Sequence, residues 1–260
     1  MSGFEWAALI GAAAWLPQIG FIIWHAFKRP KLRFSPETTI EIGFTSFGPI
    51  ANPSFAISST RKEALIENIS MDIVHDDGDT HKFRWQLLDE KGFEGTSSKG
   101  ETIELRRSQS ASALKIGTVG LIERKIAFQD VLFKIEYSKL LELLFGREKI
   151  LFEMDKSNYP ENVFLLKEYN DLHDFLKKHF YWKEGKYTVV LTVSEATLKK
   201  PHTEVFEFIL NKQNLDSLEN NRSAVQLTIK EVFLLKAGKI EKVTPISWNW
   251  IYPNIKRKTR

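Results

Sequence analysis

Residues 69–87, which read ISMDIVHDDGDTHKFRWQL, decide the fold. Apolar residues alternate with polar ones before and after the central acidic turn, at Ile69, Met71, Ile73, Phe83, Trp85 and Leu87. This period of two is typical of half-buried strands. The Asp77-Gly78 step suits a tight turn, because glycine adopts a positive φ without steric cost. The stretch therefore predicts an antiparallel β-hairpin.

The same alternation recurs on both sides of this hairpin, in the segments 39–44, 131–137, 187–193, 206–210 and 225–229. A further hairpin is expected around Ala237-Gly238. One amphipathic helix is expected near 160–180, where Leu165, Leu172 and Leu176 recur at helical spacing. A βαβ fold would need a helix between most strands. The pattern therefore predicts a mainly β chain, an antiparallel β-sandwich over residues 30–250 with one inserted helix.

The segment Gly185–Val193, which reads GKYTVVLTV, resembles a late strand of immunoglobulin-like and fibronectin-type sandwiches. The resemblance covers about ten residues of a common strand pattern. The chain has no cysteine and so lacks the cysteine pair of true immunoglobulin domains. The resemblance implies an immunoglobulin-like architecture and no particular family.

The N-terminal segment from Trp6 to Phe27 contains no Lys, Arg, Asp or Glu. A helix of about 20 apolar residues crosses the hydrocarbon layer of a bilayer. Trp6, Trp15 and Trp24 belong to this segment, and indole rings prefer the headgroup region. Pro17 and Gln18 lie near its middle. The segment predicts a transmembrane anchor over residues 1–29.

Two alternatives explain the N-terminal segment less well. A cleaved signal peptide needs a positively charged start, but residues 1–5 contain one Glu and no Lys or Arg. A buried core helix is disfavoured by the length of the segment and by its lack of charge.

The charges that flank this segment predict its orientation. Lys28, Arg29, Lys31 and Arg33 follow it, whereas only Glu5 precedes it. The positive-inside rule places the N-terminus outside and the remainder in the cytoplasm, as a single-pass protein of the inner membrane. The four cations either serve only as this topology signal or also contact anionic headgroups.

A possible helix-packing face consists of Gly11, Ala14 and Gln18. Small residues allow two helices to approach closely, and an amide can form a hydrogen bond between them. The alternative is a lone helix that faces lipid on all sides.

Composition and motifs argue against several classes of protein. The absence of cysteine excludes disulfides, cysteine-ligated zinc and thiol catalysis. A formal net charge of +4 over 260 residues is modest, so no nucleic-acid partner is expected. The chain contains no serine elbow, no phosphate-binding glycine loop and no histidine pair with zinc spacing. We therefore predict no catalytic, cofactor or metal residues and no enzymatic activity.

The acidic turn at 76–79, flanked by His75 and His81, has the composition of a metal site. It lacks the twelve-residue ligand spacing of a helix-loop-helix calcium site. Aspartate is also common in turns for conformational reasons. We interpret the cluster as a turn.

The C-terminal residues 251–260 form a basic tail, preceded by Trp248 and Trp250. Aromatic rings beside cations are able to stack on bases or lie on a membrane surface. The favoured alternative is that the aromatic residues close the core and the basic end is a solvated terminus.

These observations predict a membrane-anchored binding or scaffold protein whose cytoplasmic domain recognises a partner protein. The bilayer, a partner protein or further copies of the chain are the expected partners. The alternative is a membrane effector or pore-forming subunit, assembled through its transmembrane helix when the other domain senses a signal. Gln18→Leu distinguishes the two, because it should matter only in the second.

Overall fold

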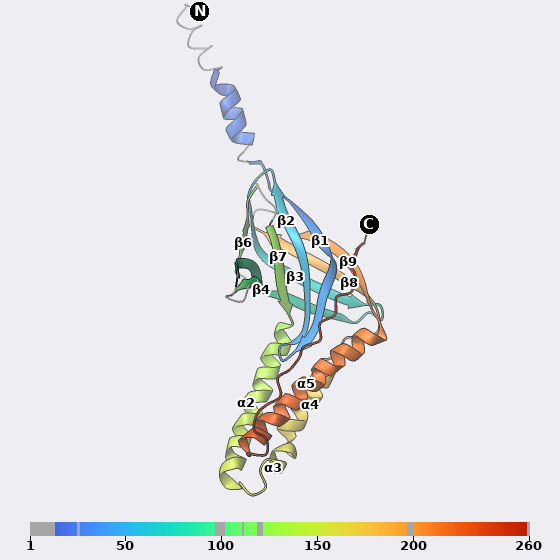
Figure 1. Ribbon diagram of the computed structural model, residues 1–260. Helices are drawn as coiled ribbons and strands as arrows, with labels where there is room; N and C mark the ends of the chain where they lie inside the picture. Colours follow the sequence, from blue (N-terminus) through green and yellow to red (C-terminus); the bar gives the residue numbers. More distant parts are fainter. Residues whose placement is uncertain are drawn as a thin grey trace, which may run out of the picture.

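A large antiparallel sheet forms the middle of the molecule (Figure 1). The computed structural model describes residues 14–24, 27–96, 102–110, 112–118, 122–196 and 200–258. Within them a 10-stranded sheet has the order β1-β2-β7-β4-β3-β8-β9-β10, with β5 beside β4 and β6 beside β3. The strands are β1 (Lys31–Thr45), β2 (Gly48–Thr60), β3 (Ala64–His75), β4 (Thr80–Thr96), β5 (Thr102–Ser110), β6 (Leu114–Ile116), β7 (Ile122–Gln129), β8 (Gly185–Glu195), β9 (His202–Leu210) and β10 (Lys256–Arg257).

The mainly β content and the antiparallel pairing are confirmed. The strands form one continuous curled sheet, however, and not the two separate sheets of the predicted immunoglobulin-like sandwich. The strong twist of long strands such as β1 and β4 lets one sheet enclose its own core.

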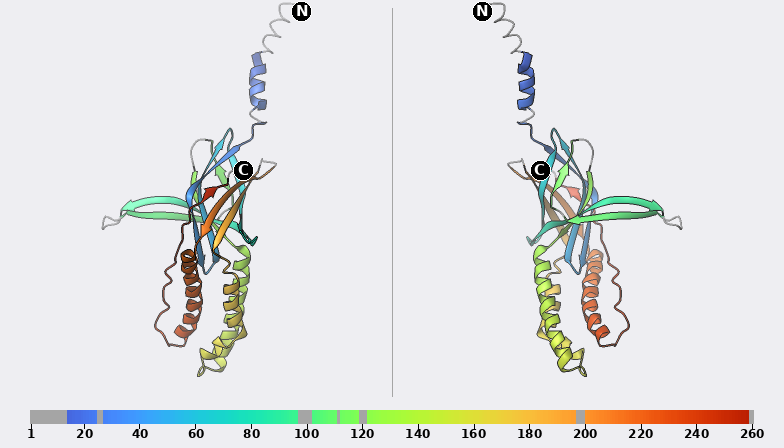
Figure 2. Two further views of the ribbon diagram at one scale, coloured as in Figure 1. Left: turned by 90° about the vertical axis from the view of Figure 1, so that its right-hand side faces the viewer. Right: turned by 90° about the vertical axis from the view of Figure 1, so that its left-hand side faces the viewer.

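The predicted hairpin is confirmed as β3 and β4. Ser70 lies opposite Arg84 and Val74 opposite Thr80, and Gly78 in the turn has a φ of +91°. The far half of β4 continues beyond the sheet and pairs with β5, from Leu87 opposite Ser110 to Thr96 opposite Thr102. Figure 2 shows this pair as a two-stranded arm that projects to one side.

Helices gather at the end of the sheet opposite the N-terminus (Figures 1 and 2). They are α2 (Val131–Met154), α3 (Glu161–Phe164), α4 (Lys167–Lys178) and α5 (Lys212–Lys236). The helix expected near 160–180 is thus confirmed, although it is divided into the two helices α3 and α4.

The strands expected at 131–137 and 225–229 are wrong, because α2 and α5 occupy those positions. The hairpin expected around Ala237-Gly238 is also wrong, because α5 ends at Lys236 and a turn follows it with no strand on either side. Each of these helices begins at a capping side chain. Asp130 Oδ1 accepts hydrogen bonds from the amides of Leu132, at 2.9 Å, and Phe133, at 3.1 Å. Asn211 and Asn214 form a reciprocal capping box.

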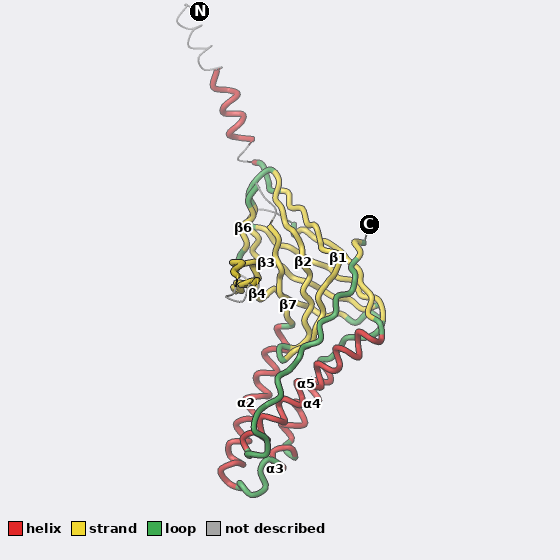
Figure 3. The backbone as a smooth tube through the Cα atoms, in the orientation of Figure 1, coloured by secondary structure: helices red, strands yellow, loops and turns green. Residues whose placement is uncertain are grey.

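The C-terminal segment returns from α5 to the sheet, as the tube in Figure 3 shows. Ile42 and Ile251 exchange backbone hydrogen bonds of 2.9 and 3.1 Å. Further along, Lys256 lies opposite Glu207 of β9. The segment thereby connects β1 with β9, so the basic end that we expected to be solvated is partly built into the sheet.

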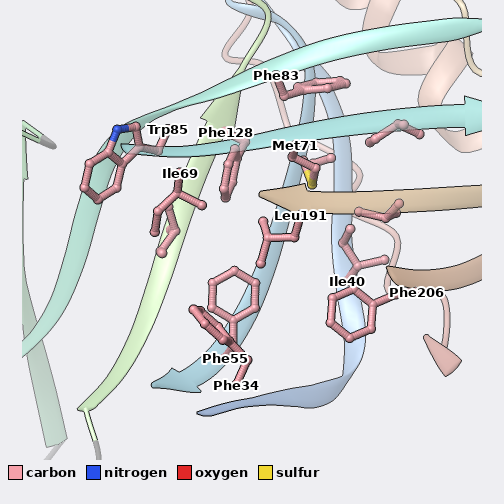
Figure 4. Packing of buried hydrophobic residues seen from close by; sticks show 14 of the residues in the cluster. Phe34, Ile40, Phe55, Ile69, Met71, Phe83, Trp85, Phe128, Leu191 and Phe206 are labelled. Carbon is pink, nitrogen blue, oxygen red and sulfur yellow. The ribbon is translucent and has the colours of Figure 1, made fainter. Parts of the chain in front are cut away.

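Two hydrophobic clusters fill the interior. The first lies within the curled sheet and includes Phe55, Met71, Phe83 and Phe206 (Figure 4). The second joins the helices. Phe44 of β1 is fully buried in this second cluster, with its ring 6.1 Å from that of Phe133 on α2. Each such buried aromatic ring contributes about 2–3 kcal/mol, so the helices are held firmly against the sheet.

The helix at residues 14–24 precedes the sheet. In the parts of the chain that the structure describes, we find no helix with the length and apolar character needed to cross a membrane. The predicted transmembrane anchor over residues 1–29 is therefore corrected, and so are the inner-membrane localisation and the cytoplasmic orientation that depended on it.

Candidate functional site

The predicted residues of the N-terminal segment are described only in part. Trp6 and Gly11 lie outside the described residues. Ala14, Trp15, Pro17, Gln18 and Trp24 lie on the helix at 14–24, which is exposed along its whole length. A packing role for Ala14 and Gln18 stays a prediction.

The four cations that follow are divided between two places. Lys28 Nζ lies 4.6 Å from the ring centre of Trp24. These two residues, with Phe27, Arg29 and Arg61, line a hollow of about 530 Å³. Lys31 and Arg33 instead project from β1 as exposed side chains. Their predicted role as a topology signal falls with the corrected localisation, whereas their contact with anionic headgroups stays a prediction.

The acidic turn between β3 and β4 forms an ion cluster with the β8 side of the sheet. Lys183 Nζ lies 2.8 Å from Asp77 Oδ2 and 3.1 Å from Asp79 Oδ2. His75 is buried, with Nδ1 2.9 Å from Asp77 Oδ1 and Nε2 3.1 Å from the carbonyl oxygen of Glu184. The hydrogen bonds from Lys183 are the largest cause that holds the pKa of Asp77 and of Asp79 below its usual value.

The polar groups of this cluster satisfy one another. Asp77 Oδ1 also accepts the Asp79 amide at 2.9 Å, as expected for an aspartate that stabilises a turn. Within the described residues, no three His, Asp or Glu side chains are grouped so as to hold a metal ion. The interpretation as a turn is confirmed, and we assign the cluster a structural role.

A second ionic cluster lies inside the helical end. The carboxylate of Glu148 is buried and accepts a hydrogen bond of 2.9 Å from the Tyr159 hydroxyl. Lys236 Nζ of α5 lies 2.7 Å from the same oxygen. Burial, followed by the Glu148 contact, raises the pKa of Tyr159. This cluster fastens α2 to α5 and is filled by its own partners.

The best candidate site is a groove beside β9 with a volume of about 600 Å³. β9 and the C-terminal segment form its walls. Its lining residues are Pro201, His202, Thr203, Glu204, Val205, Arg257 and Lys258. It thus combines apolar walls with several polar groups, as binding sites usually do.

Glu204 organises the polar side of the groove. It is buried, with Oε1 2.8 Å from His202 Nε2. Arg257 Nη2 donates to both carboxylate oxygens, at 2.6 and 2.5 Å. The His202 ring also stacks on Phe34, with centroids 4.9 Å apart. These contacts fix the positions of His202 and Arg257 before any ligand arrives.

Several donors in the groove have no partner in the described part of the chain. Arg257 binds Glu204 through one of its three nitrogens, which leaves Nε and Nη1. His202 Nε2 donates to Glu204, so Nδ1 of the neutral ring is an acceptor, and it too has no partner within the described residues. Both side chains reach solvent, with 55% of Arg257 and 30% of His202 exposed. The groove therefore offers fixed donors to an incoming acceptor.

The edge of β9 adds backbone groups to the groove. The amide of Lys258 donates to the carbonyl oxygen of Val205 at 3.0 Å, and Lys256 pairs with Glu207. Because a strand alternates the direction of its backbone groups, Thr203 presents its N–H and C=O on this same edge. No described segment pairs with Thr203 there.

Sequence reasoning missed this groove. His202, Thr203 and Glu204 stand in an ordinary alternating strand, and Arg257 and Lys258 were assigned to a solvated tail. The mixture of His and Glu at the start of a strand was a weak signal. Only the pairing of β10 with β9 brings the two halves together.

Comparisons with known proteins do not assign a family. No family model matches the chain, and no curated protein matches it. One solved structure that matches is the family 123 glycoside hydrolase from Clostridium perfringens, described in connection with glycolipid glycan hydrolysis. The match has 10% identity and a TM-score of 0.32 and covers 70% of this chain and 28% of the hydrolase.

This comparison corrects the expectation that the chain is not an enzyme. A structure with which the chain shares some similarity is a hydrolase, so that expectation is withdrawn. A TM-score of 0.32 is too low to assign an activity in its place.

Proposed function

We propose that the chain is a binding protein that captures an extended, acidic segment of a partner protein in the groove beside β9. The observation that carries the proposal is the edge at Thr203, with which no described segment pairs, next to the fixed guanidinium of Arg257. An added strand would bind through its backbone, as in β-augmentation. Its side chains would meet the groove alternately.

The charges of the groove favour a carboxylate in the partner segment. Glu204 pairs with Arg257, and Glu207 pairs with both Lys258 and Lys186, so three cations face two carboxylates at this edge. The two unpaired nitrogens of Arg257, Nε and Nη1, each carry N–H groups that a carboxylate of the partner segment can accept. Pro201 and Val205 provide apolar contact for the alternating residues. An acidic and β-branched segment therefore fits better than a basic one.

The test uses fluorescein-labelled octapeptides of alternating sequence, Glu-Val, Gln-Val and Lys-Val, with binding followed by fluorescence anisotropy. We expect affinity to decrease in that order. Arg257→Lys keeps a cation beside Glu204 but removes the Nε and Nη1 donors, and should weaken Glu-Val binding roughly tenfold. Lys115→Gln removes an exposed lysine of β6 outside the groove and should leave binding unchanged.

The backbone part of the proposal has its own readout. Thr203→Pro removes the edge amide, and proline is tolerated on an edge whose N–H faces solvent. We expect it to weaken all bound peptides about three- to tenfold, since one hydrogen bond contributes about 1 kcal/mol. Equal affinity for the three peptides, or an amide resonance of Thr203 that does not shift on titration, would refute the proposal.

A further inference from the structure

The helix α2 carries apolar side chains on two faces. Its inner face buries Phe133, Tyr137 and Leu144 against the other helices. On the opposite side, apolar residues recur at helical spacing with between 47% and 78% of each exposed: Leu132, Ile135, Leu143, Ile150 and Met154. A helix that is apolar all round is normally buried on both sides, so this outer stripe indicates an interaction surface.

Gly146 lies in the middle of the stripe. A Cβ atom added at this position would meet no atom within 4 Å. The glycine is therefore not required by packing inside the chain, although it costs helix stability of about 1 kcal/mol relative to alanine. A small residue at the centre of an exposed apolar stripe allows another helix to cross closely there.

The charges along the stripe identify the partner as a second copy of the same helix. At 100° per residue the four charged residues fall within an arc of about 80°: Glu142 and Lys149 border the stripe on one flank, and Lys139 and Glu153 lie within it on either side of Gly146. None of the four has an ion-pair partner within the described residues of its own chain. When two copies of a helix pack antiparallel, the same flank of each meets the other.

We propose that the chain forms a dimer through antiparallel contact of the outer α2 faces, crossing at Gly146. Lys139 and Glu153 are seven residues before and after Gly146, so each faces the other across a two-fold axis. Glu142 and Lys149, four before and three after, also meet. Each contact occurs twice by symmetry. The stripe supplies the apolar centre and the four ion pairs supply the register.

Cysteine crosslinking tests the geometry directly, because the chain contains no cysteine. Gly146→Cys should give a disulfide-linked dimer under mild oxidation. Leu132→Cys should not, because the two copies of residue 132 would be roughly 40 Å apart at 1.5 Å per residue. A mixture of Lys139→Cys and Glu153→Cys chains should give the mixed dimer. Crosslinking of Leu132→Cys instead would show a parallel pair and overturn the proposal.

Charge reversal tests the ion pairs. We expect Lys139→Glu and Glu153→Lys each to weaken dimerisation at least tenfold in sedimentation velocity, since each creates two like-charge contacts. The double variant should regain most of the affinity. Lys134→Glu makes the same charge change on α2 away from the stripe and should behave as the unmodified protein. A chain that stays monomeric near 100 μM, or a double variant that does not recover, would refute the proposal.

Discussion

The residues of the β3–β4 turn are predictable from local sequence, but one of their ion-pair partners lies far away in the chain. The Asp77-Gly78 step predicts the turn from sequence, and the structure confirms it. Lys183, however, is 106 residues from Asp77. It reaches the turn only because β8 lies beside β3 in the sheet. Turn chemistry is local and could be predicted; an ion pair across the sheet depends on strand order and could not.

The same residues predict a pH dependence of stability. The folded pKa of Asp77 and of Asp79 lies below that of the unfolded chain, which is about 3.9. The folded state therefore binds fewer protons in this range, so their contribution is present above about pH 4 and is lost as the pH falls through the folded values.

Lys183→Met tests this dependence because Lys183 is the main cause of both pKa shifts. We expect the variant to have a lower urea midpoint than the unmodified protein at pH 6 and to lose less of it on acidification. The difference between the two proteins should shrink progressively as the pH falls below about 4. Lys115→Met, which removes an exposed lysine from a different strand, should follow the unmodified protein. Parallel curves for Lys183→Met and the unmodified protein would contradict the prediction.

Among the elements, α2 and α5 show why period two is an unreliable guide in short segments. Val225, Leu227 and Ile229 alternate with polar residues and predict a strand. A helix buries Leu218, Val225, Ile229 and Phe233, which recur at helical multiples. Val225 and Ile229 therefore belong to both the alternating pattern and the helical pattern. The capping residues Asp130 and Asn211 are the local signal that would have indicated helices.

Alanine substitutions in α5 distinguish the two patterns in solution. Ile229→Ala should lower the free energy of unfolding by about 2–4 kcal/mol, because the side chain is buried in the second cluster. Leu227→Ala should change it by less than about 0.5 kcal/mol, because half of that side chain is exposed. In a strand both residues would share one face, and equal losses in urea unfolding would contradict the helix.

At the scale of the whole molecule, the C-terminal segment joins parts of the fold that are far apart in sequence. The sequence predicts that aromatic residues of this segment close the core; Trp250 packs on Gly43 and the adjacent Ile251 is buried, whereas Tyr252 is 56% exposed. The sequence contains no comparable signal that β10 pairs with β9, because a pair of residues such as Lys256–Arg257 has no recognisable strand pattern. The candidate groove depends on that pairing, so the site was less predictable than the fold.

Gly43 determines whether this segment stays in place. A Cβ atom at this position would lie 2.6 Å from Cε3 of Trp250 and still closer to Cζ3. Gly43→Ala should therefore displace the Trp250 ring, lower the free energy of unfolding by about 1–3 kcal/mol and expose residues 245–258 to proteolysis. Gly146→Ala, at a position open to solvent, should instead stabilise the dilute protein slightly.

A second variant separates the contact between Gly43 and Trp250 from any general effect on β1. If the Trp250 ring causes the loss, Trp250→Leu should leave room for the new methyl group. The double variant should then lose less than the sum of the two single variants in urea unfolding. It should also recover protection of the C-terminal segment from proteolysis.

Because the same segment carries Arg257, Gly43→Ala should weaken binding of the Glu-Val peptide from a position outside the groove. Strictly additive losses would show that Gly43→Ala acts through β1 itself, and that the contact between Gly43 and Trp250 does not influence the groove.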